Sequence, residues 1–69
     1  MFELERYYSN LKNIRLERGL TIEELSKETG VAPRTIMVIE SEEGSNPQIA
    51  TVKRIMKYFD ISFEELYPA

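Results

Sequence analysis

The chain has 69 residues, with nine Lys plus Arg against twelve Asp plus Glu, and it contains no Cys and no His. This length predicts a single domain, residues 1–69, and below about 70 to 80 residues natural domains often need disulfides or metals for stability. Because Cys and His are absent, we expect neither, and we expect helix packing to stabilise the core without metal or cofactor. The same absence excludes the usual nucleophile, base and zinc arrangements of enzymes.

Adjacent carboxylates occur at positions 23–24, 42–43 and 64–65. On a helix, neighbouring side chains point about 100° apart, so these pairs do not converge on one substrate. We therefore expect a protein that is not an enzyme and has no small-molecule site. No apolar run approaches the roughly 18 residues of a membrane span, and the N-terminus lacks the pattern of a signal peptide, which predicts a cytoplasmic protein.

The first predicted helix runs from Met1 to Arg18. Its apolar residues Leu4, Tyr8, Leu11 and Ile14 lie close to one helical stripe, and Gly19 ends it. Tyr7 and Tyr8 are expected at the core or its edge rather than in a stacking role.

Two short helices are predicted between residues 20 and 40. Thr21 is a candidate N-cap, and Glu24 completes a capping box with it. Gly30 can take the left-handed conformation that closes a helix, and Pro33 occupies the first helical position, where proline is best tolerated. A tight turn therefore joins the two helices.

The second of these helices has two distinct faces. Ile36 and Ile39 lie within one turn of each other and predict a narrow buried stripe. The opposite face, which we expect to be open, carries Arg34, Met37, Val38 and Ser41. A helix, a short turn containing Gly and a second helix with a presented face is the geometry of a helix-turn-helix.

The next helix is predicted from Asn46-Pro47, with Gln48 as an alternative boundary, to Phe59. Its apolar face consists of Ile49, Val52, Ile55, Met56 and Phe59. Its basic residues Lys53, Arg54 and Lys57 project elsewhere. They either follow phosphates or only keep the surface soluble.

A short last helix is predicted after Asp60, because Ser62 and Glu65 form a second capping box. Phe63, Leu66 and Tyr67 expose more apolar surface than so short a helix can hide. They either cover the core, which we favour, or form a dimer contact.

The run LTIEELSKETGVAPRTIMVIE, followed by NPQIATVKRIMKYFDISFEELY, resembles the phage repressor and Cro type of helix-turn-helix domain over roughly residues 11–67. The resemblance implies an all-α five-helix bundle with its motif at about residues 21–40. It also implies a sequence-specific DNA-binding transcriptional regulator whose second motif helix, about 33–40, enters the major groove. The implied partners are double-stranded DNA, with a palindromic operator, and a second copy of the chain.

The resemblance also assigns roles to individual positions. The positions matched to base reading are Pro33, Arg34, Met37 and Val38, and those matched to the DNA backbone are Thr21, Ile22, Ser41 and Lys53. In this family an Arg of the first helix pairs beneath the surface with a Glu at the end of the recognition helix, and the matching positions are Arg15 and Glu40. Glu40 falls on the side of Ile36 and Ile39, where a carboxylate needs a partner.

Several departures keep a second hypothesis open. The net charge is −3, and Glu42 and Glu43 occupy the loop where relatives often carry basic residues. Met37 and Val38 are apolar where the family commonly has polar side chains, and Ile22 stands where many relatives have Gln. The alternative is an acidic protein-interaction or dimerisation module derived from a helix-turn-helix. DNA binding is favoured, because apolar groups can contact thymine methyls.

Overall fold

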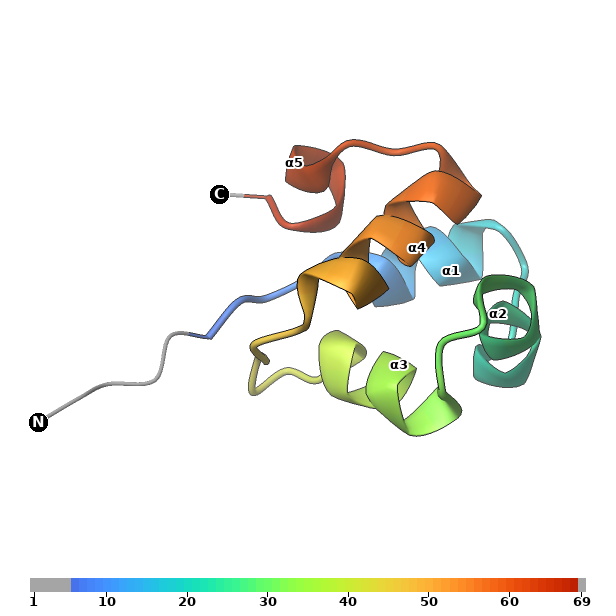
Figure 1. The fold of residues 1–69 in the computed structure, drawn as a ribbon, viewed down its shortest axis with the longest axis horizontal. Coiled ribbons are helices and arrows are strands. Elements are labelled where there is room, and N and C mark those ends of the chain that lie inside the picture. Colours follow the sequence, from blue (N-terminus) through green and yellow to red (C-terminus); the bar gives the residue numbers. More distant parts are fainter. Residues whose placement is uncertain (1–5, 69) are drawn as a thin grey trace, which may run out of the picture.

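The computed structural model describes residues 6–68, and within this range the chain forms a small bundle of helices (Figure 1). The five helices are α1 (Leu11–Glu17), α2 (Ile22–Thr29), α3 (Pro33–Glu40), α4 (Ile49–Phe59) and α5 (Phe63–Leu66). Residues 6–68 contain no strand, only an isolated antiparallel bridge between Tyr7 and Ser45. The predicted all-α fold with five helices is confirmed. No helix in the same range is long and apolar enough to cross a membrane.

Local signals fix both ends of α2. The Glu24 amide donates to Thr21 Oγ1 at 3.0 Å, and the Thr21 amide donates back to Glu24 Oε1 at 2.9 Å, which completes the predicted capping box. Gly30 ends α2 with a φ of 76°, in the left-handed region. Pro33 then begins α3 at a position that needs no backbone N–H donor.

The core lies where α1, α2, α3 and α4 meet, and α5 covers one end of it. Its fully buried side chains are aliphatic except for one phenylalanine: Leu11, Leu25, Ile36, Ile39, Ile55, Phe59 and Leu66. Ile36 and Ile39 on α3, and Ile55 and Phe59 on α4, stand three and four residues apart, so these two helices each turn one stripe inward.

The first helix is shorter than predicted, because α1 begins at Leu11 and not near Met1. Tyr7 instead pairs with Ser45 of a distant loop: the Tyr7 amide donates to the Ser45 carbonyl at 2.8 Å, and the Ser45 amide donates back at 3.0 Å. Tyr8 is exposed and belongs to no helical stripe. The predicted stripe residue Leu4 lies outside the described residues.

The predicted apolar face of α4 is wrong at its first position. Ile49 is 71% exposed, although Val52, Ile55 and Phe59 are buried as expected. The helix begins at Ile49 with Gln48 as its N-cap, so Ile49 lies in the first turn, beyond the edge of the core.

Two long-range contacts tie the ends of α1 to the C-terminal part of the chain. The Asn10 amide donates to the Leu66 carbonyl at 2.7 Å, which joins the start of α1 to the end of α5. At the other end, the Arg18 guanidinium lies 5.2 Å from the centre of the Phe59 ring, and its Nη2 donates to the Phe59 carbonyl at 3.3 Å. Both ends of α1 are therefore held by other parts of the fold.

Candidate nucleic-acid interface

The helix α3 has one buried face and one presented face. Ile36 and Ile39 are fully buried, whereas Met37 is 57% exposed and Val38 is 47% exposed. Arg34 is exposed on the presented face, and Pro33 is exposed at its first turn. The four residues matched to base reading, Pro33, Arg34, Met37 and Val38, therefore all have solvent-exposed side chains on one helix.

A groove of about 350 Å³ lies between α3 and the start of α4. Arg34 and Val38 line it from α3, and Thr51 lines it from α4. The connecting loop contributes the remaining polar lining residues, Ser45, Asn46 and Gln48, together with Pro47. The groove thus combines one guanidinium with hydroxyl and amide side chains from two further segments.

The first turn of α4 faces the same groove. No side chain caps this turn, because Gln48 makes no capping hydrogen bond and no acidic residue follows it there. Uncapped N–H groups and the positive end of the helix dipole favour an anion such as a phosphate. Sequence reasoning assigned no role to Asn46, Gln48 and Thr51. The sequence signal that could have indicated this site is Asn-Pro-Gln, residues 46–48, directly before a helix.

The residues matched to the DNA backbone are more scattered. Thr21 is exposed, but its side chain already accepts a bond from Glu24, and Ile22 is half-buried against the core. Ser41 ends α3 and accepts a hydrogen bond from the Glu43 amide at 3.1 Å. Lys53 lines a different groove, described below, and is not among the residues that line the groove beside α3.

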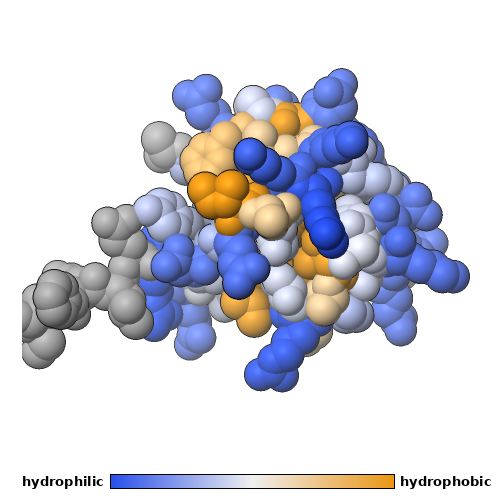
Figure 2. All heavy atoms as spheres, in the orientation of Figure 1, coloured by the Kyte–Doolittle hydropathy of each residue, from blue (hydrophilic) through white to orange (hydrophobic). Residues whose placement is uncertain are grey.

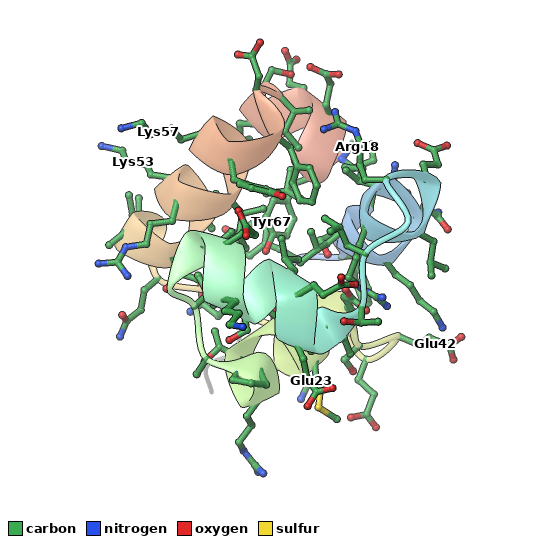
Figure 3. The ribbon with its side chains drawn as sticks, turned by 90° about the vertical axis from the view of Figure 1, so that its right-hand side faces the viewer. Arg18, Glu23, Glu42, Lys53, Lys57 and Tyr67 are labelled. Atoms are coloured by element: carbon green, nitrogen blue, oxygen red, sulfur yellow. The ribbon has the colours of Figure 1, made fainter. Side chains whose placement is uncertain are left out.

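Two exposed lysines of α4 lie apart from two exposed glutamates of α2 and the loop after α3. In Figure 3, Lys53 and Lys57 project together from α4, while Glu23 and Glu42 project on other sides of the molecule. The acidic loop also has a basic neighbour, because Arg6 Nη1 donates to the Glu43 carbonyl at 3.1 Å. This neighbour was not identified from the sequence, since Arg6 and Glu43 are far apart in the chain.

Beneath α3 lies the ion pair between Arg15 and Glu40. Arg15 Nε donates to Glu40 Oε2 at 2.7 Å and Arg15 Nη2 donates to Glu40 Oε1 at 3.0 Å, a bidentate arrangement. Arg15 Nη1 also donates to the Leu20 carbonyl at 2.8 Å. The hydrogen bond to Glu40 raises the pKa of Arg15, although burial acts in the opposite direction.

A second, apolar groove of about 560 Å³ lies where α4 meets α5. Figure 2 shows apolar side chains gathered in the upper part of this face, over α4 and α5. The side chains that line this apolar groove are mainly aromatic and aliphatic: Tyr7, Pro47, Ile49, Val52, Met56, Phe63 and Tyr67, with Asn46 and Lys53. Phe63 is 51% exposed and stacks on Tyr67 with ring centres 5.3 Å apart.

Phe63, Leu66 and Tyr67 were expected either to cover the core, the favoured alternative, or to form a dimer contact, and the structure divides them between the two. Leu66 is fully buried and Tyr67 is buried, so both belong to the core of one chain. Of these three residues, only Phe63 is exposed, because α5 turns Leu66 inward and Tyr67 is also buried.

A family profile described as Helix-turn-helix matches residues 11–66, which include all five helices. The chain belongs to this helix-turn-helix family. It is 33% identical over 58 residues to an uncharacterized HTH-type transcriptional regulator of Coxiella burnetii, an alignment that covers 84% of this chain and 27% of that protein. It is 37% identical over 57 residues to the SPbeta prophage-derived uncharacterized HTH-type transcriptional regulator YopO of Bacillus subtilis, covering 81% of this chain and 79% of that protein. The chain thus spans about a quarter of the Coxiella helix-turn-helix protein and most of the Bacillus one.

Proposed function

We propose that this protein is a sequence-specific DNA-binding transcriptional regulator and that α3 enters the major groove. The observation that carries the proposal is the division of α3 into two faces. Ile36 and Ile39 fix the helix to the core, while Arg34, Met37 and Val38 stay exposed. The names of the two relatives as transcriptional regulators support the same function.

Arg34 is the proposed base-reading side chain. It lies in the first turn of α3, and its planar guanidinium can donate two hydrogen bonds to the N7 and O6 acceptors of guanine. Pro33, Met37 and Val38 are apolar and suit contact with thymine methyl groups. Together these residues would distinguish base pairs by both hydrogen bonds and shape.

Phosphates are proposed to bind around this helix. The uncapped first turn of α4 and the polar side chains of Asn46, Gln48 and Thr51 lie in the groove next to Arg34. Thr21 and Ile22 at the start of the motif, and Ser41 directly after α3, are proposed to contact the DNA backbone, Ile22 by packing alone. Lys53 is proposed for a peripheral phosphate, because it projects from α4 outside the groove beside α3 (Figure 3).

Two copies of the chain are proposed to bind a palindromic operator. The proposed contact between copies is the apolar groove at α4 and α5, where Ile49 and Phe63 are exposed. Covering this apolar patch removes it from water, which favours association. A two-fold dimer also matches the symmetry of a palindromic site.

An acidic protein-interaction module is the second candidate. The net charge of −3 and the exposed Glu42 and Glu43 favour it, since like charges repel a DNA backbone. Titration of the protein with a random-sequence duplex, first at low salt and then at higher salt, separates the two candidates. DNA binding that weakens steeply with salt supports the regulator, and absence of binding at low salt supports the interaction module.

A further inference from the structure

Residues 6–9, here called the strap, run beside the loop of residues 41–48 that joins α3 to α4. Four successive strap residues contact this segment or the end of α3. Arg6 donates to the Glu43 carbonyl at 3.1 Å, and Tyr7 makes two backbone hydrogen bonds with Ser45. Ser9 Oγ donates to the Ile39 carbonyl at 2.7 Å, in the last turn of α3.

The fourth contact is the ring of Tyr8, which lies on Gly44. Gly44 has a φ of 80°, and a Cβ atom built there would lie 2.9 Å from Tyr8 Cε1 and 3.2 Å from Arg6 Cβ. Only a residue without a side chain allows the strap to approach the loop this closely. The rest of the Tyr8 side chain is largely exposed.

The loop residue held by the strap is also a wall of the groove beside Arg34. Ser45 lines that groove, and both its backbone N–H and its carbonyl are bonded to Tyr7. Asn46, Pro47 and Gln48, the next lining residues, follow it directly. The position of the groove wall therefore depends on the strap.

We propose that the strap is a positioning element of the DNA-binding surface, which holds the loop of residues 41–48 in its binding shape without touching DNA. This inference rests on the proposed function. The physical reason is conformational entropy: a loop without the strap would have to be ordered when DNA binds, and this ordering opposes binding. The strap also bonds to the backbone of the acidic loop, because Arg6 donates to the Glu43 carbonyl.

The test uses Tyr8→Ala, which removes the ring from Gly44 and leaves the net charge unchanged. Hydrogen exchange of the Ser45 amide, which is bonded to the Tyr7 carbonyl, should become roughly tenfold faster. Affinity for duplex DNA should fall by roughly threefold to tenfold, with an unchanged dependence on salt. Leu16→Ala is the matched control, since Leu16 is also exposed and apolar but lies on α1.

A double-mutant cycle with Gly44→Ala checks that the two residues act through one contact. Each single substitution separates the strap from the loop, so the loss of affinity in the double variant should be smaller than the sum of the two single losses. Additive losses would show that Tyr8 acts elsewhere and would overturn the proposal.

Other outcomes separate the strap from the proposed function. If Tyr8→Ala accelerates Ser45 exchange but DNA affinity does not change, the positioning role is wrong and the regulator remains. If Arg6→Ala lowers the salt slope by about one unit, the strap itself contacts a phosphate and the proposal fails. If the parent protein binds no DNA, the proposed function as a DNA-binding regulator is wrong. Unchanged hydrogen exchange of the Ser45 amide in Tyr8→Ala would show separately that the strap does not hold the loop.

Discussion

Arg15 and Glu40 form a bidentate pair, with donor and acceptor atoms 2.7 and 3.0 Å apart, beneath the C-terminal end of α3. Their side chains are only 9% and 7% exposed. Because Arg15 also donates to the Leu20 carbonyl, it joins α1, the residue before the N-cap of α2, and α3. This guanidinium therefore helps, together with the buried Ile36 and Ile39, to fix the orientation of α3 in the bundle.

Removal of either partner should destabilise the fold strongly. Glu40→Ala leaves a buried positive charge without its carboxylate, and we expect a loss of about 3 to 5 kcal/mol in the free energy of unfolding. Urea unfolding measures this loss. Glu42→Ala is the control, because Glu42 is exposed. A Glu40→Ala variant within about 0.5 kcal/mol of the parent would contradict the pair's structural role.

Arg34→Ala should lower affinity for the preferred site by about 1 to 3 kcal/mol and relax the choice of base at one position. Selection of binding sites from random duplexes measures the base preference. An unchanged preference would refute the base-reading role, even if overall affinity fell.

Lys53→Ala should behave differently from Arg34→Ala. If Lys53 meets only a phosphate, its loss weakens binding equally on every sequence and lowers the salt slope by about one unit. Lys57→Ala is a useful comparison, because Lys57 projects beside Lys53 from α4 (Figure 3). An unchanged salt slope in Lys53→Ala would remove Lys53 from the interface.

The proposed dimer predicts that Ile49→Glu and Phe63→Glu shift self-association towards the monomer without much loss of stability. Both side chains are more than half exposed in the single chain, so a charge there meets water unless a second copy covers it. Sedimentation at several concentrations gives the oligomeric state. Leu66→Glu is not a suitable probe, because Leu66 is fully buried and a charge there would unfold the domain.

Tyr67 should make stability sensitive to alkaline pH. Burial raises the pKa of its phenol, and the Ser45 hydroxyl opposes this rise. The folded-state pKa lies above the unfolded value, so this contribution to stability is complete below about pH 10 and is lost as the pH rises through the folded pKa. Tyr67→Phe should therefore lose less stability than the parent between neutral and alkaline pH.

The same substitution also removes a buried hydroxyl. The hydroxyls of Tyr67 and Ser45 influence each other, but among residues 6–68 neither Tyr67 Oη nor Ser45 Oγ makes a hydrogen bond of normal geometry. Tyr67→Phe should therefore change stability at neutral pH by less than about 1 kcal/mol, in either direction. Tyr58→Phe is the control for both measurements, because Tyr58 is partly exposed. A parent and a Tyr67→Phe variant with identical pH profiles would contradict the role of burial.

Local signals in the sequence were sufficient to predict most of the helices and their ends. The capping boxes at Thr21 and Ser62, the left-handed Gly30 and the buried Ile36 and Ile39 all depend on residues within a few positions of each other. Such short-range patterns can be interpreted from a single chain.

The start of α1 could not be predicted in this way, because Tyr7 leaves the helical pattern to pair with Ser45 of a distant loop. One local signal was available. Ser9 Oγ accepts a hydrogen bond from the Leu11 amide at 3.3 Å, as a polar residue before a helix often does. The groove beside Arg34 was also not predictable, since its lining comes from α3, the loop and α4.

The bond from the Asn10 amide to the Leu66 carbonyl also bears on the order of folding. It joins residues near opposite ends of the chain, so it can form only after the intervening helices have come together. The helix α5 has four residues and cannot persist without its neighbours. We therefore expect α5 and the start of α1 to assemble late and to open together in partial unfolding, while α2 and α3, which are adjacent in sequence, assemble early.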